Sequence, residues 1–241
     1  MQLRTVFRPD QGTHSVVRIN ALWRAVVLAA LLLSSPLVAA NGMCPGSLQW
    51  VMNAMDLDAC RPAPISAAEK AILLESLPAE GEVTHLTKSE RRKLAALDPV
   101  LRLHGRKGVY GLKVIALPQA WTGLYERAVL LISLPALRLL DSEELQAVVA
   151  HEIGHEYVWQ EYAIAQRRND IARLRELELT CDAIAVLTLM RLGVNPHRLV
   201  TAVEKGLRFN QGRFGRPRNE NSYPPLMVRR DLVKRMSSAI K

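Results

Sequence analysis

Two histidines with three residues between them constrain this chain more than any other feature of the sequence. His151 and His155 lie in an apolar, helix-favouring run at residues 145–159, which follows a capping and acidic segment at residues 141–144. Residues four apart on a helix share a face, so both imidazoles can point at one position. Two imidazoles placed in this way can supply two ligands of a tetrahedral zinc ion. Glu152, beside the first histidine, can then act as general base next to the metal.

A catalytic zinc site also needs a third protein ligand, and the helix predicted at residues 171–192 offers candidates. Glu178 and Asp182 are one helical turn apart and face the same way. We predict that Glu178 binds the metal and that Asp182 hydrogen-bonds a ligand histidine and fixes its tautomer. Glu176 is the main competitor for the ligand role, and Glu161 is a weaker one. The alternative interpretation of these carboxylates is a solvated acidic helix face.

The first forty residues have the pattern of a signal peptide. Four arginines precede an unbroken apolar run at residues 25–33, and small residues at 38–40 offer a cleavage site. We therefore predict that residues 1–40 are removed and that the protein is periplasmic or secreted. The alternative is a protein anchored by an uncleaved leader, although the apolar segment is short for a membrane span.

The cysteines and the net charge indicate which compartment and which binding partners the protein is expected to have. In an oxidising compartment Cys44 and Cys60 can form a disulfide around a short loop, whereas Cys181 is expected to be a small buried residue. Loss of the leader, with its four arginines and one aspartate, lowers the formal net charge from +9 to +6. That charge favours peripheral contact with anionic envelope surfaces. No basic stripe is interleaved with aromatic residues, so we do not expect a nucleic-acid partner.

The region between the leader and the predicted metal site is expected to be helical. Capping boxes at residues 66–69 and 87–90 predict two short helices, the second ending near residues 98–99. We interpret residues 41–108 as an N-terminal helical cover with a disulfide loop, and residues 109–241 as the catalytic domain.

The predicted catalytic domain begins with β-prone sequence and ends with helices. Residues 110–117 and 128–134 are strand candidates, and residues 119–127 are interpreted as the connection between them. These features predict an α+β fold, mostly helical, with a small sheet beside the histidine-bearing helix. An exposed strand edge there could accept an extended peptide, although both strands could equally be interior. We expect a polar, basic loop at residues 207–221 before the last helix.

Three segments resemble the motifs of metallopeptidase family 48. This is the group of HtpX-like, Oma-like and CAAX-prenyl-type zinc endopeptidases, which are gluzincins in fold. The segments are residues 147–155 (AVVAHEIGH), the pair of Glu178 and Asp182, and residues 223–229 (YPPLMVR). They occur in the same order as in the family, and the similarity extends over residues 109–235.

The resemblance implies particular roles for the candidate residues. It implies zinc ligation by His151, His155 and Glu178, acid/base catalysis by Glu152, and a supporting role for Asp182. It also implies that the strand around residues 112–117 lines the substrate cleft. Two features depart from the family pattern: the interval between the second histidine and Glu178 is short, and Tyr223 stands where the family often has histidine. A tyrosine can still donate a hydrogen bond to a developing oxyanion.

We therefore expect an exported endopeptidase with one zinc ion per chain, acting on extended segments of envelope or misfolded proteins. Glu152 would take a proton from a zinc-activated water, and Tyr223 or Arg229 would help to stabilise the oxyanion. One alternative is a non-catalytic, chaperone-like binding protein that retains a zincin-like fold. Another is a zinc-dependent hydrolase of non-peptide substrates. The sequence predicts no oligomeric state.

Overall fold

A computed structural model of the chain describes residues 48–54, 56–58, 60–77, 81–215 and 223–239. The predicted signal peptide at residues 1–40 lies outside the described residues. The described part of the chain has an α+β fold that is mostly helical with a small sheet, as predicted. Within these residues, no helix combines the length and the apolar character needed to cross a bilayer.

The helices and strands begin mostly where the capping and strand signals predict. In chain order they are α2 (Leu48–Ala54), α3 (Ala67–Ser76), α4 (Lys88–Ala95), α5 (Asp98–Leu103), β1 (Gly111–Ile115), β2 (Thr122–Tyr125), β3 (Val129–Ser133), α6 (Leu134–Leu139), α7 (Ser142–Tyr157), α8 (Trp159–Arg168), α9 (Ile171–Arg191), α10 (His197–Phe214) and α11 (Leu226–Ala239). Ser66 and Thr87 form the two predicted capping boxes, and Asp141 forms a third at the start of α7. These caps satisfy main-chain N–H groups that have no partner inside the helix.

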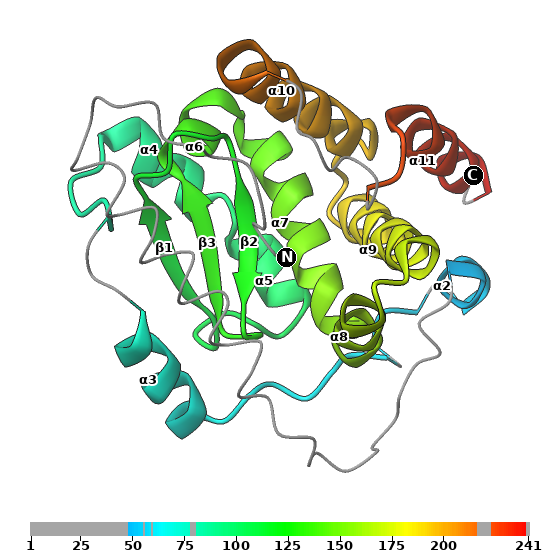
Figure 1. Cartoon of the computed structure of the whole chain (residues 1–241), viewed down its shortest axis with the longest axis horizontal. Helices are drawn as coiled ribbons and strands as arrows, with labels where there is room; N and C mark the ends of the chain where they lie inside the picture. The colour runs from blue at the N-terminus through cyan, green and yellow to red at the C-terminus, as the bar shows by residue number, and fades with distance from the viewer. Residues whose placement is uncertain (1–47, 55, 59, 78–80, 216–222, 240–241) are drawn as a thin grey trace.

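In the described residues the strands form one sheet with the spatial order β1-β3-β2. β1 runs parallel to β3, and β2 runs antiparallel to it. The turn between β2 and β3 is tight, with positive φ at Glu126 (45°) and Arg127 (56°). Figure 1 shows β2 at the edge of the sheet nearest α7, with β1 at the opposite edge. The sheet therefore presents β2, the shortest of its strands, to the histidine-bearing helix.

The two longest elements of the predicted site, α7 and α9, pack directly against each other. They approach closely at Gly154, where an added β-carbon would lie 2.8 Å from the Cα of Cys181. A glycine is therefore required at this crossing, because a larger residue would push the two backbones apart. The close crossing brings the face of α7 that carries the two histidines against the middle of α9.

The region that the sequence predicts as an N-terminal cover, residues 41–108, contributes side chains to two hydrophobic clusters. Leu97 and Val100 lie in the main core together with residues of α7 and α9. On the other face of the sheet, the partly buried Leu73 of α3 packs against a cluster that includes Ile115 of β1. Within the described residues, the predicted boundary at residue 108 does not separate two hydrophobic cores.

The strand β2 was not predicted from the sequence, because residues 119–127 were interpreted as a connection. The segment that forms the strand, Thr-Gly-Leu-Tyr, is four residues long and contains a glycine, which weakens its intrinsic strand preference. Pairing with the fully buried β3 decides its conformation. Such tertiary stabilisation leaves little trace in local sequence.

Two predicted helix boundaries were wrong. The loop expected at residues 207–221 is helical in its first part, because α10 continues to Phe214, while residues 216–222 lie outside the described residues. Only the first turns of α10 bury apolar side chains, so the polar remainder looked like a loop. The helix expected to end near residues 98–99 ends earlier, and Asp98 instead begins α5 with Pro99 in its first turn.

Candidate metal centre

Three predicted ligands converge between α7 and α9. His151, His155 and Glu178 each offer one ligand atom, and these atoms lie within 4.8 Å of one another. The Oε2 atom of Glu178 is 3.3 Å from Nε2 of His151, and its Oε1 atom is 3.9 Å from Nε2 of His155. We call these three residues the metal-ligand cluster. The i, i+4 spacing on α7 and the crossing at Gly154 together produce it.

Asp182, one turn after Glu178 on α9, holds the ring of His151. Its Oδ1 atom is 2.8 Å from Nδ1 of His151, which leaves Nε2 directed at Glu178. Burial opposes protonation of His151, but its hydrogen bonds to Asp182 and Glu178 outweigh burial and raise its pKa to about 10. Asp182 and Glu178 thus hold the imidazole of His151 between them. This is the contact that the sequence analysis predicted for Asp182.

The donor set fits a zinc ion. Burial alone would raise the pKa of Glu178, but the hydrogen bond from His151 and the charges of His155, His151 and Arg229 lower it to about 2. Burial lowers the pKa of His155, so its imidazole is neutral at neutral pH. Two imidazole nitrogens and one ionised carboxylate form a ligand set of catalytic zinc sites.

Two further side chains donate hydrogen bonds to the carboxylate of Glu178. The hydroxyl of Tyr162 on α8 donates to its Oε1 atom at 2.7 Å. Arg229 on α11 donates to Oε2 of Glu178 at 3.4 Å and to Oδ1 of Asp182 at 3.0 Å. Arg229 was predicted to assist the oxyanion, but its contacts tie it to the two carboxylates. The sequence analysis did not identify Tyr162, because its contact with Glu178 joins two different helices.

Glu152 occupies the position expected of a general base, next to His151 on α7 and half-buried. The hydroxyl of Thr122, the first residue of β2, donates to Oε1 of Glu152 at 2.8 Å. Sequence reasoning missed Thr122 because it missed β2. The contact joins the edge of the sheet to the histidine-bearing helix α7.

Tyr223, which begins the third motif, lies close to the same carboxylates. Burial raises the pKa of its phenol well above the ordinary value, and the charges of Glu178 and Glu152 raise it further. The phenol is therefore protonated at neutral pH and can act as a hydrogen-bond donor. The charges that act on this phenol place Tyr223 near Glu178 and Glu152.

The cysteines occupy two different environments. Cys60 is disulfide-bonded, and Cys44, its predicted partner, lies outside the described residues. Cys181 is a free, fully buried thiol whose Sγ atom is 3.5 Å from Nδ1 of His155. The sequence analysis predicted a small buried residue at position 181, and it did not predict the contact with a ligand histidine.

The two competing carboxylates are outside the metal-ligand cluster. Glu176 accepts from Nη1 of Arg173 at 2.6 Å, and Glu161 pairs with the same guanidinium. Both carboxylates are partly exposed. They act as surface ion-pair partners of Arg173, so Glu178 is the acidic residue that geometry assigns to the cluster.

The strand beside α7 is β2, and the resemblance implied a different strand for the substrate cleft. The resemblance implied residues 112–117, but β1 is the edge strand farther from α7. Its outer edge is also partly covered, because Val83 N–H donates to Val114 C=O at 2.8 Å and Ala116 N–H to Gly81 C=O at 2.7 Å. β2 is the strand that contacts α7. The spatial order of the strands differs from their chain order, and the sequence pattern could not reveal this.

The outer edge of β2 carries main-chain groups available for pairing. Ser133 N–H donates to Trp121 C=O, so these two residues form a hydrogen-bonded pair of the antiparallel ladder. Successive residues alternate, which turns the N–H and C=O groups of Thr122 and Leu124 away from β3. In the described part of the chain neither residue has a main-chain partner on that side.

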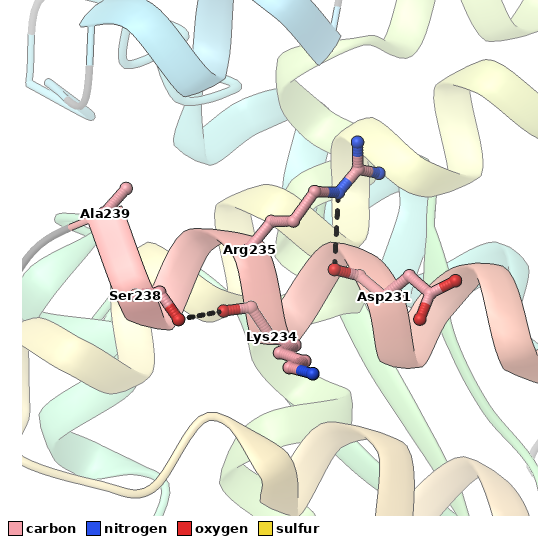
Figure 2. A pocket seen from close by; sticks show the side chains of 5 residues that line it. All are labelled: Asp231, Lys234, Arg235, Ser238 and Ala239. Atoms are coloured by element: carbon pink, nitrogen blue, oxygen red, sulfur yellow. Dashed lines mark hydrogen bonds between the residues drawn. The ribbon is translucent and has the colours of Figure 1, made fainter.

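A separate surface pocket lies on α11 (Figure 2). It is lined by Asp231, Lys234, Arg235, Ser238 and Ala239. Arg235 Nε donates to the carbonyl of Asp231 at 3.4 Å, and Ser238 Oγ donates to that of Lys234 at 3.0 Å. None of these residues belongs to the metal-ligand cluster, so the pocket is not part of the candidate metal centre.

Comparison of the chain with protein-family models and with curated proteins found no match.

Proposed function

We propose that the protein is a zinc-dependent endopeptidase with a zincin-like fold, related to the metallopeptidase family 48 that its motifs resemble. The observation that carries this proposal is the convergence of His151, His155 and Glu178 within 4.8 Å, with Glu152 adjacent on α7. The order of the three motifs and the contacts of Asp182 with His151 and Arg229 support it further.

In this proposal His151, His155 and Glu178 hold the metal. A bound zinc ion supplies Lewis acidity, which lowers the pKa of a water molecule and polarises a carbonyl group. Glu152 accepts the proton of the attacking water and returns it to the leaving amine. Because Thr122 binds Oε1 of Glu152, the second carboxylate oxygen is the proton acceptor.

Tyr223 and Arg229 have different parts in this mechanism. The phenol of Tyr223 stays protonated, because burial and two nearby carboxylates raise its pKa, and it donates a hydrogen bond to the oxyanion. Arg229 is buried and contacts Glu178 and Asp182, so it positions the proposed ligand and the carboxylate that orients His151.

We propose an extended polypeptide as the substrate. The outward-facing main-chain groups of Thr122 and Leu124 can pair with a peptide strand, and Thr122 is also the residue that contacts Glu152. Main-chain pairing binds many sequences, because it uses groups common to all peptides. The proposed substrates are therefore unfolded or extended segments of envelope proteins.

The proposed location is the periplasm or the extracellular space. The leader pattern at residues 1–40 supports export, and the disulfide at Cys60 is typical of oxidising compartments. The positive net charge favours peripheral contact with anionic envelope surfaces.

The test is a comparison of the wild-type protein with Glu152→Gln. We expect the wild-type protein to contain zinc and to cleave unfolded casein in a reaction that EDTA suppresses. Glu152→Gln should retain zinc and lose hydrolysis, because an amide cannot accept the proton. Glu143→Gln is the matched control, since Glu143 is on the same helix but forms a partly exposed ion pair with Arg198.

The alternatives predict other results. If Glu152→Gln cleaved casein at the wild-type rate, the proposed mechanism would be wrong. A wild-type protein that binds unfolded casein without cutting it would favour the non-catalytic, chaperone-like alternative. Zinc-dependent hydrolysis of esters without peptidase activity would favour the hydrolase alternative.

A further inference from the structure

The side chain of Asn210 on α10 hydrogen-bonds to the main chain of Ala120, two residues before β2 begins. Its Oδ1 atom accepts a hydrogen bond from Ala120 N–H at 2.8 Å, and its Nδ2 atom donates to Ala120 C=O at 3.0 Å. One carboxamide therefore satisfies both of the main-chain groups that Ala120 directs away from the sheet. A residue of a neighbouring strand would make the same two bonds.

The position of this contact matters because of the alternation along β2. Ala120, Thr122 and Leu124 direct their main-chain groups to the same side, away from β3. Asn210 satisfies the first of these residues, whereas in the described residues the other two have no main-chain partner there. Thr122, at the boundary, is also the residue that binds Glu152. The outer edge of β2 is thus paired with Asn210 on one side of Glu152, the proposed catalytic base. On the other side, this edge has no main-chain partner among the described residues.

We propose that Asn210 is a specificity-determining residue that ends substrate pairing on one side of the cleaved bond. This inference rests on the proposed peptidase function. Antiparallel addition is the more stable pairing per residue, and in it the peptide residues that follow the cleaved bond lie toward Ala120. Peptide residues more than about two positions after the bond meet Asn210 instead of a free strand edge. The substrates therefore pair with β2 mainly through residues that precede the cleaved bond.

The experiment uses two nested sets of peptides that share one cleavage site. One set is lengthened residue by residue after the cleaved bond, and the other is lengthened before it. The measured quantity is kcat/KM for the wild-type protein, Asn210→Ala and the control Gln211→Ala. Gln211 is the next residue of α10, and its side chain does not hydrogen-bond to Ala120. Thermal unfolding verifies that all three proteins are folded.

For the wild-type protein and Gln211→Ala, we expect kcat/KM to stop rising after about two added residues on the side that follows the bond. For Asn210→Ala it should continue to rise, by about threefold to tenfold, because Ala120 can then make one or two further main-chain hydrogen bonds. The set lengthened before the bond should give the same profile in all three proteins.

Two results would overturn the inference while leaving the peptidase function intact. The first is an identical length profile for Asn210→Ala and the wild-type protein. The second is an equal loss of kcat/KM in both peptide sets, which would mean that Asn210 only holds α10 in place. Absence of any cleavage by the wild-type protein would instead overturn the proposed function, and the inference with it.

Discussion

At the residue scale, each ligand of the proposed metal centre has a neighbour that fixes its orientation. Asp182 holds Nδ1 of His151, Tyr162 and Arg229 hold the carboxylate of Glu178, and Cys181 lies against Nδ1 of His155. Such contacts restrict the rotamers of each candidate ligand, so less side-chain freedom is lost when a metal binds. These contacts therefore restrict the orientations of all three candidate ligands.

The contact between Asp182 and His151 leads to a prediction about metal affinity. Asp182→Asn keeps the size of the side chain but removes the charge that orients the imidazole and increases its basicity. We expect zinc affinity to fall by about 10-fold to 100-fold. Competition with a chromophoric chelator measures the change, and Glu176→Gln on the same helix is the control because Glu176 forms a partly exposed ion pair with Arg173. An unchanged affinity in Asp182→Asn would contradict this assignment.

At the scale of elements, the site depends on how closely α7 approaches α9. The histidines are on one helix and Glu178 is on the other, so a wider separation would move the carboxylate away from both imidazoles. Gly154 permits the approach, because even a β-carbon at this position would overlap the backbone of Cys181. A glycine inside a helix normally lowers helix stability. Its presence at position 154 is therefore explained by the close packing against α9.

Gly154→Ala should therefore destabilise the protein, by about 1–3 kcal/mol, because overpacking forces backbone shifts. Gly212→Ala is the matched control, since Gly212 is also inside a helix but has no atom within 4 Å of an added β-carbon. We expect this control to stabilise the protein by about 0.5–1 kcal/mol through helix propensity. Urea unfolding followed by circular dichroism measures both changes. Equal effects of the two substitutions would argue against a tight crossing at Gly154.

At the scale of the whole molecule, a buried polar contact joins three separate parts of the chain. His104, which follows α5, has Nδ1 2.8 Å from the hydroxyl of Tyr157 and Nε2 2.9 Å from Oγ1 of Thr188. Burial is the main cause that lowers the pKa of His104 to about 3, and the charges of nearby arginines contribute. The folded protein therefore holds this imidazole in its neutral form.

This pKa predicts how stability depends on pH. Between about pH 6.5 and 3 the unfolded chain binds a proton at His104 and the folded protein does not. The stabilisation is complete above pH 6.5 and is lost as the pH falls, at up to roughly 1.4 kcal/mol per pH unit. Denaturant unfolding of the wild-type protein and His104→Gln at several pH values isolates this contribution. The two proteins should differ in slope, and parallel slopes would show that His104 is not the cause.

Local sequence determined most of the helices and the identity of the metal-ligand cluster. Ser66, Thr87 and Asp141 cap helices at the predicted positions because capping depends on residues close together in the chain. The i, i+4 spacing of His151 and His155 places both rings on one face of α7 for the same local reason. Glu178 could be chosen only because it lies one turn from Asp182 on a helix that was itself predictable.

The tertiary structure alone decided which strand lies beside the proposed metal centre. β2 is short and contains a glycine, so its conformation depends on pairing with β3, which is a contact between distant main-chain groups. The spatial order β1-β3-β2 then places Thr122 against Glu152 and Ala120 against Asn210. Local pattern cannot encode these contacts, because they join residues 30 and 90 positions apart in the chain.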